Sequence, residues 1–461
     1  MPAATTSSLV LRERPARGSL DVSQCFERVD SPSDSSKRLP PGHVAGKVRY
    51  IGIEPAQRNW LESSSRSYLP GVKLGEVMRS RGVGVVTEST CPELVPGDLV
   101  EGLLGWQTHF RLPAKEVRKR SLLQGDHDER HLIGLLSSTG MAAYVGTCVL
   151  LQLGERDVVL VTGAGGGVGS LAVQMAAARG AKVIATTTKA GKKRHIAGAA
   201  HVIDWSSDEA RAGMQATFRS FGGLSAVVDN VGGEVLDEAL LGLRPKARVI
   251  LCGSSSTYGG HPTPLKNLFR VLETSASLQG FNVDDYEEHF SKAEHQMSEW
   301  LSRGQLKVSY DVRKGLNSCP EALTRLLQRQ TNGKAIVSLV DEQEAEGLQW
   351  QDDTIEAQGR SICLQCCAPS GKAERTILFV CGTGFPKELW KPVAQRVQAG
   401  ASSTKFIVFD MSLQGYSGLL NEGLDLPFSV DLFARDIAAV LQHLDNTHAI
   451  VVAHSIGGAA A

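Results

Sequence analysis

The 461-residue sequence lacks a long apolar run, an excess of charge of either sign and a regular cysteine framework. A membrane-spanning helix needs about 20 consecutive apolar residues, and no segment reaches that length, so no membrane partner is expected. Lys plus Arg and Asp plus Glu number 49 each, which argues against nucleic acid as a partner. The polar residues 1–8 have no apolar signal-peptide core. These absences predict a cytoplasmic protein.

Nine cysteines form an odd set without framework spacing, which is typical of reduced thiols in a reducing compartment. Cys363, Cys366 and Cys367 form the local cluster. No second Cys pair or His pair accompanies them, and their segment has the pattern of a strand, so we predict buried or edge thiols and no metal site. The length allows two or three domains, and a hydrophobic content of 42% suffices for their cores.

An apolar strand runs into a glycine-rich loop and then directly into a helix at residues 157–174. Glycines let the backbone approach a pyrophosphate, and the start of a helix favours negative charge. An ordinary tight turn is the alternative, but a second strand at 181–185 completes a strand-helix-strand unit. We therefore predict a phosphate site, in which the candidate residues are Gly163, Gly166, Gly167, Val168 and Gly169.

Hydroxyl and basic residues follow the second strand, where NAD enzymes carry an Asp or Glu for the ribose. The chain has threonines at 186–188, and then Lys189, Lys192 and Lys193. These groups suit a 2′-phosphate, so we predict NADPH as the cofactor, with Thr187 and the three lysines among its ligands. A solvated helix face is the alternative for the basic run, and equal turnover with NADH would contradict the preference.

The pattern of apolar segments divides the chain into regions. Residues 8–125 have short apolar segments broken by Gly and Pro, which predicts a β-rich domain, completed by 276–340. Strands alternate with helices over 126–275, which predicts a doubly wound parallel sheet in an α/β protein. Residues 341–358 begin with an acidic run and are the predicted linker to a further region, 359–461.

Seven motifs occur in order along residues 8–340, among them the runs at 54–60, 140–144, 229–234 and 252–258. Together they resemble the zinc-free medium-chain reductases of the prostaglandin reductase and alkenal double-bond reductase branch. The resemblance implies a GroES-like catalytic domain packed on a Rossmann nucleotide-binding domain, with the substrate in the cleft between them. It also implies chemistry without a metal, and a homodimer.

The resemblance further implies hydride transfer from NADPH to the β-carbon of an enone or enal. Asn230 and Gly232 would lie near the nicotinamide, and Asn332 would contact the cofactor. Tyr258 would donate a hydrogen bond to the developing enolate oxygen; its alternative is a tyrosine that packs a loop. The sequence departs from relatives at Ala56, where many have a tyrosine, and at Trp205, where a tyrosine contacts the cofactor phosphate.

The chain ends on an apolar strand followed by His454-Ser455-Ile456-Gly457. This run resembles the nucleophile elbow of α/β-hydrolases, with Ser455 as the nucleophile. In that family the acid and the histidine follow the serine, but six residues follow Ser455 here. The resemblance therefore implies an incomplete α/β-hydrolase-like sheet without esterase activity.

The leading interpretation is an NADPH-dependent reductase of α,β-unsaturated ketones or aldehydes. An NADPH quinone reductase is the first alternative, because quinone reductases share the glycine loop and lack zinc. A bifunctional reductase-hydrolase in a longer full-length form is the second. The third is a protein that binds NADPH without turnover.

Overall fold

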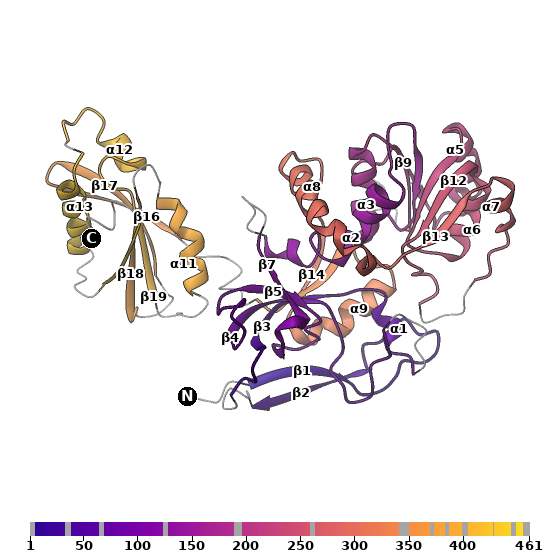
Figure 1. Ribbon diagram of the computed structural model, residues 1–461, viewed down its shortest axis with the longest axis horizontal. Helices are drawn as coiled ribbons and strands as arrows, with labels where there is room; N and C mark the ends of the chain where they lie inside the picture. Colours follow the sequence, from indigo (N-terminus) through magenta and orange to yellow (C-terminus); the bar gives the residue numbers. More distant parts are fainter. Residues whose placement is uncertain are drawn as a thin grey trace. The chain divides into compact units, whose positions relative to one another are not determined.

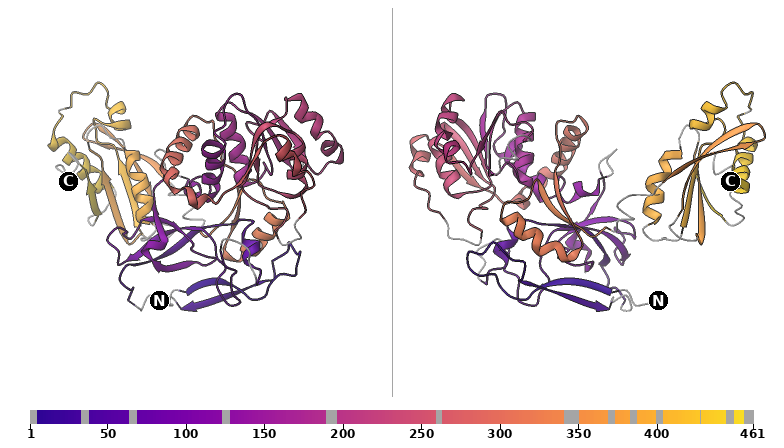
Figure 2. Two further views of the ribbon diagram at one scale, coloured as in Figure 1. Left: turned by 45° about the vertical axis from the view of Figure 1, so that its right-hand side comes forward. Right: turned by 180° about the vertical axis from the view of Figure 1, so that it is seen from behind.

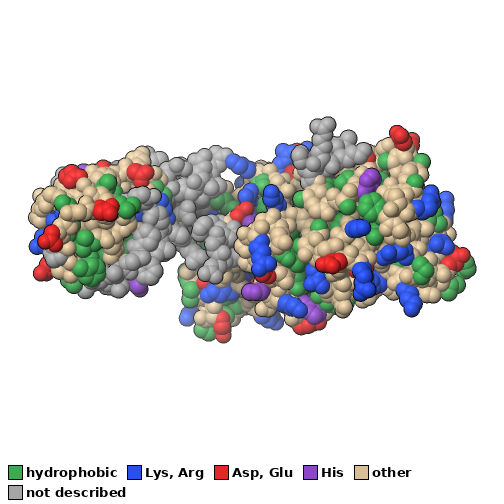
Figure 3. Space-filling view, turned by 90° about the horizontal axis from the view of Figure 1, so that it is seen from above, with side chains coloured by type: hydrophobic (Ala, Val, Ile, Leu, Met, Phe, Trp, Pro, Cys, Tyr) green, Lys and Arg blue, Asp and Glu red, His purple; other side chains and the backbone are tan. Residues whose placement is uncertain are grey.

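The computed structural model describes residues 5–32, 38–63, 69–122, 128–188, 196–258, 263–340, 350–368, 373–382, 387–398, 404–426, 428–443 and 449–454. The chain forms two compact units, Met1–Leu339 and Val340–Ala461 (Figure 1). Within the described residues, no helix is long and apolar enough to cross a membrane. On the face in Figure 3, acidic and basic side chains are interspersed.

A β-rich, GroES-like domain begins the first unit. Its seven-stranded sheet has the order β14-β15-β3-β4-β5-β7, and β6 pairs with β3. Strands β4 and β5 pair antiparallel, with Val85 opposite Leu99. The elements are β1 (Thr5–Leu11), β2 (Phe26–Pro32), β3 (His43–Gly52), α1 (Gln57–Trp60), β4 (Gly82–Ser89), β5 (Leu99–Gly102), β6 (His109–Pro113), η2 (Ala114–Glu116), β7 (Val117–Arg120), β14 (Tyr310–Lys314), η7 (Leu316–Ser318), α9 (Cys319–Leu327) and β15 (Lys334–Ser338).

A Rossmann domain lies between β7 and β14 in the chain. Its six strands have the order β10-β9-β8-β11-β12-β13 and pair in parallel. The elements are η3 (Glu129–Leu132), α2 (Ser138–Tyr144), η4 (Val145–Leu150), β8 (Val158–Val161), α3 (Gly167–Ala178), β9 (Lys182–Thr187), β10 (His201–Asp204), α4 (Asp208–Ala212), α5 (Met214–Ser220), β11 (Leu224–Asp229), α6 (Gly233–Leu241), β12 (Leu243–Leu251), α7 (Phe269–Glu273), β13 (Ser277–Gly280), η6 (Val283–His289) and α8 (Phe290–Ser302).

Helices cover both faces of the parallel sheet, as Figures 1 and 2 show. Helices α2, α3 and α8 share one core with sheet residues such as Val159 and Val183. Helices α5 and α6 share the other core with alternate residues of the same strands, including Leu160 and Ile184. Because both faces are buried, β8 has the fully apolar sequence Val158–Val161 that is typical of a central parallel strand.

The predicted return to the catalytic domain at residue 276 comes too early. Strand β13 pairs in parallel with β12, with Arg248 opposite Ser277, and is the last strand of the Rossmann sheet. Helix α8 then packs in the Rossmann core through Met297 and Trp300. The chain rejoins the seven-stranded sheet only at β14, which begins at Tyr310. At the other end, β1 begins at Thr5, before the predicted start of the domain.

The second unit is a mixed five-stranded sheet with the order β16-β17-β19-β18-β20. Strand β17 is antiparallel to β16 and β19, whereas β18 is parallel to β19 and β20. The fold prediction of a further α/β-hydrolase-like sheet is confirmed. The elements are β16 (Gln351–Ala357), β17 (Arg360–Cys367), β18 (Arg375–Val380), η8 (Lys387–Trp390), α11 (Lys391–Gln398), β19 (Thr404–Phe409), α12 (Gly415–Leu420), α13 (Val430–His443) and β20 (Ala449–Ala453).

The predicted linker extends too far toward the C-terminus. Residues 341–349 lie outside the described residues, but 351–357 form β16 and pair with β17, with Gln351 opposite Cys366. Most side chains of β16 are exposed, and Ile355 is the buried one. Strand β16 lies at the edge of the sheet, pairs with β17 and buries only Ile355. Its composition can therefore be as polar as that of a linker.

A buried acidic group gives the first unit a predicted pH dependence. Oε2 of Glu101 on β5 lies 3.6 Å from Nε of Arg120 on β7. Burial raises the pKa of Glu101 from 4.5 to about 6, although Arg120, Arg81 and Arg118 oppose the shift. Between these two pKa values the folded state binds more protons than the unfolded chain. The free energy of unfolding therefore falls as pH rises from 4.5 to 6, by ~2 kcal/mol from this group.

Chemical unfolding of the wild type and Glu101→Gln between pH 4.5 and 7 tests this expectation. The variant cannot release a proton at this position, so its free energy of unfolding should lose this part of the decline. The same decline in both proteins would assign the pH dependence to other groups.

Candidate active site

Two glycines in and beside the loop between β8 and α3 have no room or no suitable backbone conformation for a side chain. Gly163 has a φ of +61°, in the left-handed region. A Cβ on Gly169 would lie 2.3 Å from the carbonyl oxygen of Gly163, so the helix and the loop touch through backbone. Gly166, by contrast, is extended, and a Cβ there would meet one atom, 3.4 Å away.

The start of α3 provides donors for an anion. Ser170 N–H bonds to the carbonyl oxygen of Gly166 at 3.0 Å, which is the first turn of the helix. The N–H groups of Gly167, Val168 and Gly169 come before this first bond, so they have no acceptor within the helix. The positive end of the helix dipole lies at the same place. The loop and helix together can hold a pyrophosphate.

The next loop along the sheet is held by Asp229 at the end of β11. Its carboxylate accepts hydrogen bonds from Thr162 Oγ1 at 2.7 Å and from Gly232 N–H at 2.9 Å. Burial raises the pKa of Asp229, although these hydrogen bonds oppose the shift. Asn230 Nδ2 donates to the carbonyl oxygen of Thr162 at 2.8 Å. The two loops are therefore tied to each other at the carboxyl ends of the strands, where open α/β sheets bind ligands.

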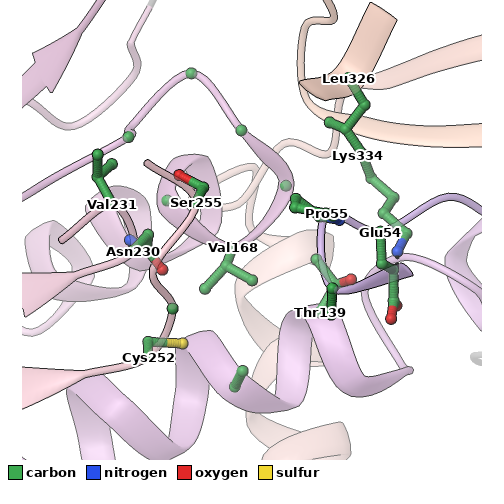
Figure 4. A pocket seen from close by; sticks show the side chains of 18 of the residues that line it. Glu54, Pro55, Thr139, Val168, Asn230, Val231, Cys252, Ser255, Leu326 and Lys334 are labelled. Carbon is green, nitrogen blue, oxygen red and sulfur yellow. Dashed lines mark hydrogen bonds and ion pairs between the residues drawn. The ribbon is translucent and has the colours of Figure 1, made fainter. Parts of the chain in front are cut away.

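A cavity of about 390 Å³ joins these loops to the catalytic domain. Figure 4 shows Asn230, Val231, Cys252 and Ser255 along one side and Pro55, Glu54, Thr139 and Lys334 along the other, with Val168 between them. Predicted site residues that line the cavity are Gly163, Gly166, Gly167, Val168, Gly169, Thr187, Asn230 and Tyr258. The structure thus brings together residues that are up to 95 positions apart in the sequence, from Gly163 to Tyr258.

Two predicted cofactor residues do not line the cavity. Gly232 has a φ of +68°, and a Cβ there would lie 2.7 Å from Ser254 Oγ, so this glycine is needed for the turn before α6. Asn332 is exposed, and its N–H bonds to Asp311 Oδ2 at 3.3 Å. Its neighbour Thr331 lines the cavity instead. Lys189, Lys192, Lys193 and Ser455 lie outside the described residues.

Threonines and an aromatic ring line the end of the cavity at β9. Thr187 and Thr188 lie there with Trp205, which follows β10. The guanidinium carbon of Arg211 is 5.7 Å from the centre of the Trp205 ring, a cation–π arrangement. Residues 186–188 include no acidic residue. A ligand at this end of the cavity would therefore contact hydroxyl groups and an aromatic ring.

Tyr258 lies half-buried in the cavity wall. The N–H of Ser254 donates to its phenol oxygen over 3.4 Å, which leaves the phenol hydrogen available to a second partner. Burial raises the pKa of Tyr258, so the phenol is protonated at neutral pH. Tyr144, by contrast, is buried against Trp300 with ring centres 6.3 Å apart.

Sequence reasoning missed an ion pair in the cavity wall. Lys334 Nζ lies 3.0 Å from Glu54 Oε1, and Ser138 Oγ donates to the same oxygen at 3.2 Å. Burial alone would raise the pKa of Glu54, but attraction to Lys334 and hydrogen bonds from both partners hold it below its usual value. Glu54 begins the motif at 54–60, but Lys334 stands in none of the motifs, and no spacing rule connects residues 280 positions apart.

Three family models match the chain. Residues 9–119 match the N-terminal domain of oxidoreductase, and residues 167–302 match the zinc-binding dehydrogenase model. Residues 377–461 match the alpha/beta hydrolase family. No group of three His, Cys, Asp or Glu side chains in the described part of the chain could hold a metal ion.

Known reductases match the first two regions over most of their length. The NADPH-dependent curcumin reductase of Escherichia coli (strain K12) is 28% identical over 308 residues, 64% of this chain and 87% of that protein. The chain belongs to the medium-chain dehydrogenase/reductase family. Within this family it is an oxidoreductase of the alkenal and curcumin reductase branch.

Two further relatives support this place in the family. The NADP-dependent 2-alkenal reductase of Nicotiana tabacum is 28% identical over 311 residues, 65% of this chain and 89% of that protein. The structure of CurA from Vibrio vulnificus in complex with NADPH is 25% identical, with a TM-score of 0.66, and the match covers 73% of this chain and 99% of that one. The medium-chain family members thus match the reductase unit, and the second unit is additional to them.

Proposed function

We propose that the first unit is an NADPH-dependent reductase that transfers hydride to the β-carbon of an α,β-unsaturated ketone or aldehyde. The observation that carries this proposal is the single cavity in which the glycine loop and the Tyr258 phenol both lie. A cavity that holds both an anion-binding loop and a neutral hydrogen-bond donor suits hydride addition to a polarised double bond. The names of the curcumin and 2-alkenal reductases agree with this chemistry.

The cavity residues fit a dinucleotide. The extended Gly166 leaves open the space that a Cβ would fill, and the free N–H groups at the start of α3 suit its pyrophosphate. Thr187 and Thr188 would meet the adenosine ribose and its 2′-phosphate, with Trp205 beside them. When bound, NADPH supplies a hydride, which brings two electrons and one hydrogen to the substrate.

Tyr258 would act on the substrate carbonyl. As hydride reaches the β-carbon, the π electrons of the carbon–carbon double bond shift toward the carbonyl and form an enolate. The phenol hydrogen of Tyr258 would donate to the enolate oxygen, while Ser254 N–H orients the phenol. The α-carbon then takes a proton from water, which gives the saturated ketone or aldehyde and NADP⁺.

NADPH oxidation by the full chain, followed by absorbance with enones, enals and quinones, tests the proposal. We expect turnover of enones and enals and a preference for NADPH over NADH. Turnover of quinones alone would favour the quinone reductase alternative. NADPH binding without turnover of any compound would favour the binding protein. The absence of esterase activity in the second unit stays a prediction, because Ser455 lies outside the described residues.

A further inference from the structure

Lys334 places a buried cation in the cavity wall. Its side chain is 5% exposed, and the residue lines the cavity. An ammonium has three N–H donors, and Lys334 gives one to Glu54 Oε1 at 3.0 Å. Among the described residues no second acceptor contacts Nζ at hydrogen-bond distance. Two donors therefore remain on an ammonium whose side chain is almost fully buried.

The backbone fixes Lys334 beside the cofactor loop. Its N–H bonds to the carbonyl oxygen of Ser309 at 2.9 Å, and the preceding Gly333 N–H bonds to that of Gly165 at 3.0 Å. A Cβ on Gly167 would lie 3.4 Å from the Lys334 Cα. From this backbone position the Lys334 side chain extends toward Glu54, as Figure 4 shows. The backbone of Lys334 is thus fixed on β15 next to the glycine loop and the start of α3.

Burying the Lys334–Glu54 ion pair costs desolvation free energy, and packing alone does not require charged residues here. Taking two charges out of water costs several kcal/mol per ion, and apolar side chains of similar volume often replace such a pair without loss of stability. Glu54 also accepts from Ser138, so its oxygen Oε1 is shared by two donors while the ammonium has one acceptor. The Lys334 ammonium therefore has more N–H donors than Glu54 Oε1 uses.

We propose that Lys334 is a second donor to the enolate oxygen, and that Glu54, which also accepts from Ser138, competes with that oxygen for the ammonium. This inference rests on the proposed function, because it requires that negative charge develops on a substrate oxygen in the cavity. Lys334 keeps its proton and donates a hydrogen bond while the π electrons move onto the carbonyl oxygen. The α-carbon still takes its proton from water, so the overall reaction is unchanged.

Binding of a chromogenic phenol tests the site without any turnover. We would use 4-nitrophenol, whose absorbance reports its ionisation and whose phenolate resembles an enolate in charge. Saturated with NADP⁺ at pH 7, the wild type should bind the phenolate in preference to the phenol. Lys334→Met should weaken phenolate binding about tenfold, whereas Glu54→Gln, which removes the competing carboxylate, should strengthen it. Lys182→Met, an exposed lysine at the start of β9, is the matched control.

Opposite effects of Lys334→Met and Glu54→Gln distinguish a charge role from a structural one. If the pair merely held the fold together, both variants would weaken phenolate binding and NADPH binding alike, and the inference would be overturned. Glu54→Gln keeps this test decisive if Lys334→Met does not fold. Equal phenolate binding by wild type and Lys334→Met would also overturn it.

Kinetics separate this inference from the proposed function. Lys334→Met should lower kcat for an enone about tenfold with the NADPH dissociation constant unchanged, and Lys334→Arg should restore most of it. Enone turnover with no effect of Lys334→Met contradicts the inference and leaves the reductase proposal standing. Phenolate binding that depends on Lys334, without turnover of any substrate, supports the anion site and contradicts the reductase proposal.

Discussion

Replacing Tyr258 by Phe is expected to lower kcat for an enone about 100-fold while the dissociation constant of NADPH stays within about twofold. The phenol lines the cavity and accepts from Ser254 N–H, so its own hydrogen can point toward the substrate. An interaction that forms only as charge develops affects kcat and not cofactor binding. Because burial raises the pKa of Tyr258, the effect should be present at neutral pH.

Steady-state NADPH oxidation and the quenching of protein fluorescence by NADPH measure the two quantities separately. Tyr144→Phe is the control, because Tyr144 is buried against Trp300 and does not line the cavity. It should keep the wild-type kcat. An unchanged kcat in Tyr258→Phe would mean that this tyrosine packs its loop, and the enolate oxygen would need another donor.

Gly166→Ala is expected to weaken NADPH binding about 10- to 100-fold without destabilising the free protein. The backbone of Gly166 is extended, and a Cβ there meets only the Gly163 carbonyl oxygen at 3.4 Å, so the methyl group fits the folded chain. It would instead occupy the space beside the helix start, where the pyrophosphate would accept charge-assisted hydrogen bonds. Each such bond is worth about 1.5–3 kcal/mol.

Gly154→Ala is the matched control for that experiment. A Cβ at Gly154 meets no atom within 4 Å, and the residue lies before β8, away from the cavity. Both variants should melt near the wild-type temperature, and only Gly166→Ala should lose NADPH affinity. Equal affinity in all three proteins would place the pyrophosphate elsewhere.

Local pattern was enough to predict the elements that form the cofactor loop. The apolar run at 158–161 is typical of a strand buried on both faces, and the glycines at 163, 166 and 169 favour a tight turn into a helix, so β8 and α3 could be predicted from local pattern. Tyr258 was identified by resemblance to a family, and the cavity then places it with the loop. Its proposed role still needs the kinetic test.

Contacts between distant segments could not be predicted in this way. Glu54 and Lys334 meet because β3 and β15 pair in one sheet, with Ile51 opposite Val337, and a single sequence does not give that pairing. Strand β13 was assigned to the wrong domain because most of its side chains are exposed and show no alternation. The sequence pattern predicts a linker at β16 for the same physical reason, since an edge strand needs few apolar residues.

The most direct test of the central claim follows the transferred hydrogen. The full chain would reduce an enone with NADPH that carries deuterium at both hydrogen positions of the nicotinamide C4, and NMR and mass spectrometry would locate the label in the product. The account predicts a saturated ketone with one deuterium on the former β-carbon and none on the α-carbon, which takes its proton from water. Deuterium on the carbonyl carbon of an alcohol product, or a reduced compound without the label, would contradict it.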